Sequence, residues 1–152
     1  KQEIVIDNLN GNKIAALGHA GMGFSSLYPI NSAESILNAL NIGADGTEID
    51  IQLTKDNVLV AFHDEDLAST SELSGVIREY TWAELQNTSF FSTQYLTYDI
   101  VRLSDFLENL ENRHEYILSF DIRTIPPKYI DLEAYTNDYI QAINLIYEEF
   151  DL

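Results

Sequence analysis

Apolar and polar residues alternate most regularly in the first third of the chain. Segment 46–54 has isoleucine and leucine on one face and Glu48, Asp50 and Gln52 on the other, which is the period of a strand. After a tight turn, residues 58–63 form an apolar run that ends in a histidine. These patterns predict two consecutive strands, the first with a face rich in acids.

The remaining pattern alternates strands with helices. Strands are also predicted over 13–21, as a buried strand that ends in a loop, and over 116–123. Helical spacing of apolar residues, or a capping residue, predicts helices over 31–43, 81–87, 102–113 and 132–150. The expected caps are Asn31 or Ser32, Thr81 and Ser104.

The acidic face decides between two α/β architectures. Strands that alternate with helices indicate parallel βαβ units. In a doubly wound sheet both faces are covered by helices and should be apolar. In a barrel, the inner face near the carboxyl ends of the strands opens onto the site and can carry acids. We therefore predict a (β/α)8 TIM barrel.

The length of the chain allows only part of such a barrel. A complete barrel takes about 250 residues, and this chain has 152. We expect a single domain over 1–152 that supplies roughly the N-terminal half, with 64–102 as a long loop or insertion. A half barrel would expose an open strand edge. We favour a truncated chain over completion by association.

Composition removes several classes of partner. Lys and Arg number 8 against 25 Asp and Glu, a formal charge of −17, which repels nucleic acid and anionic membrane surfaces. There is no cysteine, so disulfides and thiolate metal sites are excluded, and no apolar run has the length for stable membrane insertion. The chain begins at Lys1, so we expect that a segment was removed. A secreted or periplasmic location is favoured, with the cytoplasm still open.

Glu48 and Asp50 are candidates for a metal site. They point to the same side of one strand, and two carboxylates that close repel unless a cation lies between them or one is protonated. Oxygen ligands favour Mg²⁺ or Ca²⁺. By contrast, His114 at a predicted helix end and the acids on 131–151 are interpreted as structural and solvated groups.

One long ordered motif resembles a known family. The chain contains "HAG", "PINS", "GADGTEIDIQLTKDNVLVAFHD" and "LSFDIR" in this order, over nearly all of 13–123. The arrangement is similar to that of the glycerophosphodiester phosphodiesterases, which are phospholipase C-like TIM-barrel enzymes. The resemblance implies hydrolysis of a small glycerophosphodiester to glycerol 3-phosphate and an alcohol, with Mg²⁺ or Ca²⁺ as cofactor.

The same resemblance assigns roles to six residues. Glu48, Asp50 and Asp121 match the metal-binding acids, although the third is usually glutamate in the family. His19 and His63 match the acid/base pair. Arg123 matches a lysine, and we expect it to bind the phosphate.

Three positions depart from the family pattern. Ala20 stands where His-Arg-Gly has arginine, Ile30 where Pro-Glu-Asn-Thr has glutamate, and the region of Ser69 lacks a further arginine. The missing arginine and glutamate have opposite charges, so the loss of both leaves no unpaired buried charge. We expect apolar contacts in their place. Loss of the arginine predicts weaker binding of a phosphodiester, so one alternative is an impaired member that acts as a metal- or ligand-binding module. A separate alternative is a lyase-like relative that leaves a cyclic phosphate.

Overall fold

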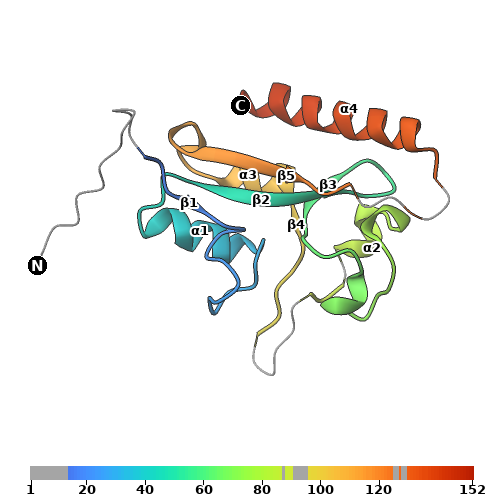
Figure 1. The fold of residues 1–152 in the computed structure, drawn as a ribbon, viewed down its shortest axis with the longest axis horizontal. Coiled ribbons are helices and arrows are strands. Elements are labelled where there is room, and N and C mark those ends of the chain that lie inside the picture. The colour runs from blue at the N-terminus through green and yellow to red at the C-terminus, as the bar shows by residue number, and fades with distance from the viewer. Residues whose placement is uncertain (1–13, 87, 91–95, 125–126, 128–129) are drawn as a thin grey trace, which may run out of the picture.

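The protein folds around one five-stranded mixed sheet with helices packed against it (Figure 1). The computed structural model describes residues 14–86, 88–90, 96–124, 127 and 130–152. The strands are β1 (Leu17–Gly18), β2 (Gly46–Leu53), β3 (Leu59–Ala61), β4 (Val101–Arg102) and β5 (Ile117–Ile122). The helices are α1 (Ala33–Asn41), α2 (Trp82–Leu85), α3 (Leu103–Asn109) and α4 (Leu132–Phe150), with 3₁₀ turns at Leu67–Ser69, Ile77–Glu79 and Arg113–Glu115.

The long strand β2 organises the sheet. It runs parallel to β1 and to β5, as the predicted βαβ pattern requires. It runs antiparallel to β3, which in turn pairs with β4 in the antiparallel sense. The short turn between β2 and β3 has Asn57 at a positive φ of 63° and is too short for a crossover, so these two strands form a hairpin.

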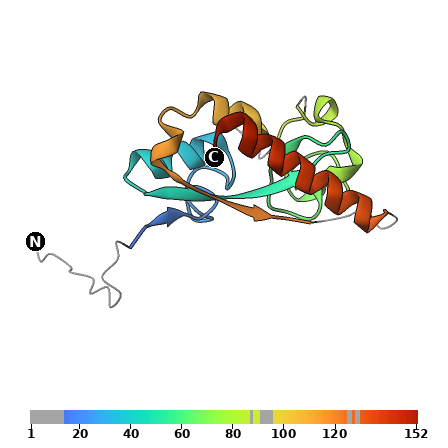
Figure 2. The same ribbon diagram turned by 90° about the horizontal axis from the view of Figure 1, so that it is seen from above.

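The register of β2 with β5 separates a polar face from an apolar face. Glu48 lies beside Ser119 and Asp50 beside Asp121, whereas Ile49 lies beside Phe120. The apolar face packs against α1, α3 and α4 in one core cluster, on the same side of the two strands (Figure 2). The predicted alternation along 46–54 is therefore confirmed, and the acids are left on the face away from the helices.

Helix boundaries follow local hydrogen bonding. Ser32 is the cap of α1, because its hydroxyl accepts from the Ser35 N–H at 3.1 Å. Thr81 and Glu84 form a capping box at α2. The prediction of Ser104 as the cap of the third helix is wrong, since α3 begins at Leu103 directly after β4.

Two predicted elements are shorter in the structure. The strand expected to be buried over 13–21 is only β1, and Leu17 on it is 42% exposed because β1 pairs with β2 alone. The helix expected over 102–113 stops at Asn109, since Leu110 has an extended conformation. In contrast, α4 covers the predicted 132–150 in full.

The described part of segment 64–102 is packed. It carries two 3₁₀ turns and α2, and together with β3 it encloses a second cluster of buried apolar residues, namely Val60, Phe62, Leu67, Ile77, Leu85, Phe90 and Ile100. Residues 87 and 91–95 of the predicted loop lie outside the described residues. The segment therefore supports the end of the β2–β3 hairpin.

Large apolar side chains are exposed at both sides of the sheet and on the outer helix. Leu17 on β1 and Ile117 on β5 are about half exposed, and so are Ile140 and Leu145 on α4. None of the helices within the described residues is long and apolar enough to cross a bilayer.

Candidate metal and acid/base site

Three carboxylates converge on the polar face of β2 and β5. Glu48 and Asp50 alternate along β2, and Asp121 is the register partner of Asp50 on β5. One oxygen of each lies within 4.8 Å of one oxygen of the other two. The three acids expected to form a metal site are thus brought together by neighbouring parallel strands.

Glu48 is partly buried beside the other two acids. One of its oxygens accepts a hydrogen bond from the Ala20 N–H at 2.8 Å. Burial raises the pKa of Glu48, and the charges of Asp50 and Asp121 add to the increase, against the lowering effects of the Ala20 N–H and His19. Burial, supported by the neighbouring acids, therefore disfavours the ionised form of Glu48.

Asn31 fixes the orientation of Asp50. Its side-chain amide donates to one Asp50 oxygen at 2.8 Å, and its carbonyl oxygen accepts from the Asp50 N–H at 3.0 Å. Both residues are almost fully buried, and Asn31 has a left-handed φ of 61°, which asparagine tolerates well. Sequence reasoning missed this role and treated Asn31 only as a candidate cap; its place in the "PINS" motif was the available signal.

Arg123 contacts two of the three acids. Its Nη1 lies 3.6 Å from an oxygen of Asp50 and 3.6 Å from an oxygen of Asp121. The backbone N–H of Arg123 donates to the Ile51 carbonyl at 3.0 Å, which extends the ladder between β5 and β2. The guanidinium therefore enters the acidic cluster from the end of β5.

Both predicted histidines lie against one aromatic ring. The ring of Phe24 is 5.6 Å from that of His19 and 5.5 Å from that of His63, centroid to centroid, in edge-to-face arrangements. Phe24 is 65% exposed, so the ring lies at the surface between the two imidazoles. Sequence reasoning did not single out Phe24, because a lone phenylalanine in a loop carries no pattern.

Asp64 orients His63. The Asp64 carboxylate is 2.8 Å from His63 Nδ1, and it accepts from the Ser69 hydroxyl at 2.5 Å. Burial alone would raise the pKa of Asp64, but the hydrogen bonds from His63 and Ser69 outweigh it and hold this pKa below the usual value. An ionised Asp64 favours the tautomer with the proton on Nδ1, which leaves Nε2 of His63 with its lone pair.

Gln52, the third polar residue on the inner face of β2, has a positioning role. Its buried side-chain amide donates to the carbonyls of Phe62 at 3.0 Å and Asp64 at 2.8 Å. These bonds hold the backbone on both sides of His63. The polar face of β2 thus consists of two acids in the cluster and one amide that fixes the histidine loop.

Ala20 joins the first loop to α1. It is fully buried with a left-handed φ of 48°, and its carbonyl accepts from the Asn31 N–H at 3.0 Å. Ile30, the other departure from the family pattern, is only partly buried. The expected apolar contact between these positions stays a prediction.

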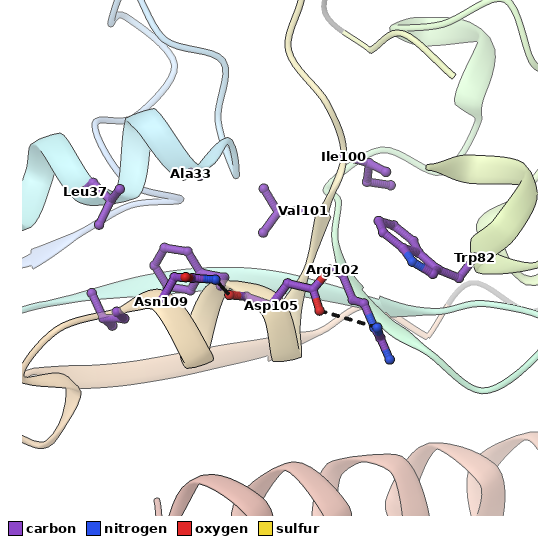
Figure 3. Close-up of a pocket in the computed structure, with 10 residues that line it drawn as sticks. Ala33, Leu37, Trp82, Ile100, Val101, Arg102, Asp105 and Asn109 are labelled. Atoms are coloured by element: carbon purple, nitrogen blue, oxygen red, sulfur yellow. Dashed lines mark hydrogen bonds and ion pairs between the residues drawn. The ribbon is translucent and has the colours of Figure 1, made fainter. Parts of the chain in front are cut away.

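A separate pocket lies between α1, α2, β4 and α3 (Figure 3). It has a volume of about 300 Å³ and is lined by Leu37 of α1, Phe106 of α3 and Trp82 of α2, among others. The ion pair between Arg102 and Asp105 lies at its wall. Neither histidine and none of the three carboxylates lines this pocket, so it is not the candidate site.

Known proteins share the sequence pattern and the fold of this chain. The sequence profile of the Glycerophosphoryl diester phosphodiesterase family matches residues 22–147. The chain belongs to this family. Among its curated relatives in the family is the glycerophosphodiester phosphodiesterase of Bacillus altitudinis, 31% identical over 129 residues, which are 83% of this chain and 53% of the relative. Another, from Caldanaerobacter subterraneus, is 31% identical over 65% of this chain and 46% of its own length.

Solved structures of phosphodiesterases in this family share the fold. The Thermotoga maritima enzyme matches with a TM-score of 0.67 and 27% identity over 91% of this chain and 51% of its own. A protein from Silicibacter pomeroyi matches with a TM-score of 0.75 and 20% identity, over 91% of this chain and 54% of its own. An Oleispira antarctica phosphodiesterase was solved in complex with the product sn-glycerol-3-phosphate. It matches with a TM-score of 0.73 and 24% identity, over 90% of this chain and 53% of its own.

These matches confirm the predicted fold class and family. The chain spans about half the length of the relatives it matches, as expected for roughly half of a TIM barrel. The strands β1, β2 and β5 are its parallel strands; Asp121 lies near the carboxyl end of β5, beside Asp50 in the middle of β2.

Proposed function

We propose that this chain carries the metal and acid/base groups of a glycerophosphodiester phosphodiesterase. The reaction would add water to a glycerophosphodiester and release glycerol 3-phosphate and an alcohol. The observation that carries the proposal is the convergence of the three carboxylates Glu48, Asp50 and Asp121. It is supported by the two imidazoles, which both contact the ring of Phe24.

The carboxylates fit a hard divalent cation. They offer only oxygen atoms, and burial and crowding already raise the pKa of Glu48, so a cation would relieve repulsion there. Mg²⁺ or Ca²⁺ would supply Lewis-acid polarisation of a phosphoryl oxygen. Asn31 keeps one oxygen of Asp50 occupied by a hydrogen bond and so fixes the direction of the other.

The histidines would move the protons. One imidazole takes a proton from the attacking water, and the other gives a proton to the oxygen of the leaving alcohol. Asp64 and Gln52 hold His63 for this role. Arg123 contributes positive charge next to the phosphate, in a site where the family arginine is replaced by Ala20.

Substitution in the full-length protein tests this function. Glu48→Ala and His63→Ala are each expected to abolish divalent-dependent release of glycerol 3-phosphate from glycerophosphocholine, measured with a coupled dehydrogenase assay. His114→Ala is the matched control, because His114 is exposed and outside the cluster, and it should retain activity. Wild-type protein that is inactive with every headgroup and either metal would contradict the proposal.

A second candidate is a non-catalytic module that binds metal or ligand. The replacement of the family arginine by Ala20, together with an Arg123 that is engaged by two carboxylates, favours weak hold on phosphate. Cation binding in a titration without any turnover would support this candidate. Analysis of the products separates hydrolysis from the lyase-like alternative, which leaves a cyclic phosphate.

A further inference from the structure

Arg123 occupies an unusual position in the acidic cluster. A single nitrogen, Nη1, lies at the same distance of 3.6 Å from Asp50 and from Asp121. Within the described residues, no other Lys or Arg lies within ion-pair distance of Glu48, Asp50 or Asp121. Arg123 is therefore the counter-ion of Asp50 and Asp121 within the described residues, and a single positive charge offsets only part of the charge of the cluster.

The same two carboxylates cannot serve the guanidinium and a divalent ion equally. A cation bound by Asp50 and Asp121 would lie close to Nη1, and like charges a few ångströms apart repel each other even at an effective dielectric of about 20. The backbone of Arg123 is fixed by its hydrogen bond to Ile51, but its side chain is 29% exposed. The side chain can thus leave the acids by rotation, without movement of β5.

We propose that Arg123 competes with the metal ion for Asp50 and Asp121, and that metal binding releases its guanidinium toward the substrate phosphate. This inference rests on the proposed function. Before the metal binds, Arg123 limits repulsion among the acids and so stabilises the site. After the metal binds, the freed planar fork can form paired hydrogen bonds with phosphate oxygens. Metal and phosphate binding are coupled through one side chain.

Calorimetric titration with MgCl₂ and CaCl₂ tests the competition. The full-length protein is first treated with chelator, and ionic strength is held constant. Arg123→Gln is expected to lower the dissociation constant for the cation about tenfold or more, because the competing charge is gone. Arg102→Gln makes the same change in net charge at a surface ion pair with Asp105, outside the cluster, and should alter the constant by less than about threefold.

Thermal melts in chelator and in saturating MgCl₂ provide a second measurement. Arg123→Gln should melt below the wild type in chelator and should gain more from magnesium. Unchanged or weaker cation binding by Arg123→Gln, with binding by the wild type intact, would overturn the competition alone. Absence of cation binding in all three proteins would overturn both the competition and the metal-dependent function.

Discussion

The negative charge of Glu48 is unfavourable in the metal-free protein. Burial and the neighbouring charges of Asp50 and Asp121 raise its pKa, so ionisation of Glu48 costs stability when no metal is bound. A group whose pKa is raised by folding stabilises the protein at pH below its unfolded value. This contribution is lost as the pH rises through the folded value, which for Glu48 lies above 4.5.

Glu48→Gln should therefore stabilise the metal-free protein at neutral pH. The amide is uncharged, and its oxygen can still accept from the Ala20 N–H. We expect a higher melting temperature than that of the wild type in chelator near pH 7, and convergence of the two as the pH falls toward about 4, where Glu48 is itself protonated. Melting curves across this range check the prediction. A variant less stable than the wild type at every pH would show that the Glu48 charge is already compensated.

At the scale of residues, the sequence identified the side chains that belong to a periodic pattern or a family motif. It missed the roles that depend on contacts between loops. Glu48, Asp50 and Asp121 follow from strand alternation and from the family motif, and the structure brings them together. Phe24 and Asn31 act through a ring contact and a left-handed turn, which depend on how two loops meet. Only the place of Asn31 in the "PINS" motif pointed to its role, and no local pattern pointed to Phe24.

The pairing of β2 with β5 is the element on which the acidic cluster depends. Gly46 lies beside Ile117 at the start of this ladder, and a Cβ on Gly46 would be only 1.9 Å from the Ile117 carbonyl oxygen. That oxygen belongs to the backbone and cannot rotate away. Glycine at this position therefore allows the two strands to approach closely, in the register that places Asp50 beside Asp121.

Gly46→Ala should destabilise the protein by about 3 kcal/mol, because the new methyl group forces the strands apart. Urea denaturation measures the change in the free energy of unfolding. Ser119→Ala is the control on the same ladder, since Ser119 is exposed on β5, and it should change stability by less than about 0.5 kcal/mol. Equal stability of Gly46→Ala and wild type would mean that β5 can shift without cost.

Elements were predictable where hydrophobic periodicity was long. The helix over 132–150 was recovered in full because its apolar residues repeat over 19 residues and contact the core throughout. The helix over 102–113 was misplaced because β4 runs directly into Leu103, which leaves no loop for a Ser104 cap. The strand over 13–21 was overestimated because strand length depends on a pairing partner, and within the described residues β1 pairs only with β2.

At the scale of the whole molecule, the net negative charge and the exposed edges of the sheet both oppose a compact folded state. The chain carries a formal charge of −17, and the outer strands of the described sheet include β1 and β5, on which Leu17 and Ile117 are about half exposed. Self-repulsion of a strongly acidic chain opposes compactness. The barrel fold could be predicted because an acidic strand face fits a barrel better than a doubly wound sheet, whereas the length of the chain indicated that only about half of a barrel is supplied.

Salt should therefore stabilise the whole molecule, and divalent cations should stabilise the site in addition. Raising NaCl to about 0.5 M shortens the screening length well below 10 Å, so the melting temperature should rise similarly for wild type and Glu48→Gln. MgCl₂ at matched ionic strength should add a further rise in the wild type only, of ~2–4 °C for each kcal/mol of binding free energy in a protein of this size. Scanning calorimetry measures both effects. The same magnesium increment in both proteins would assign it to general screening instead of the three carboxylates.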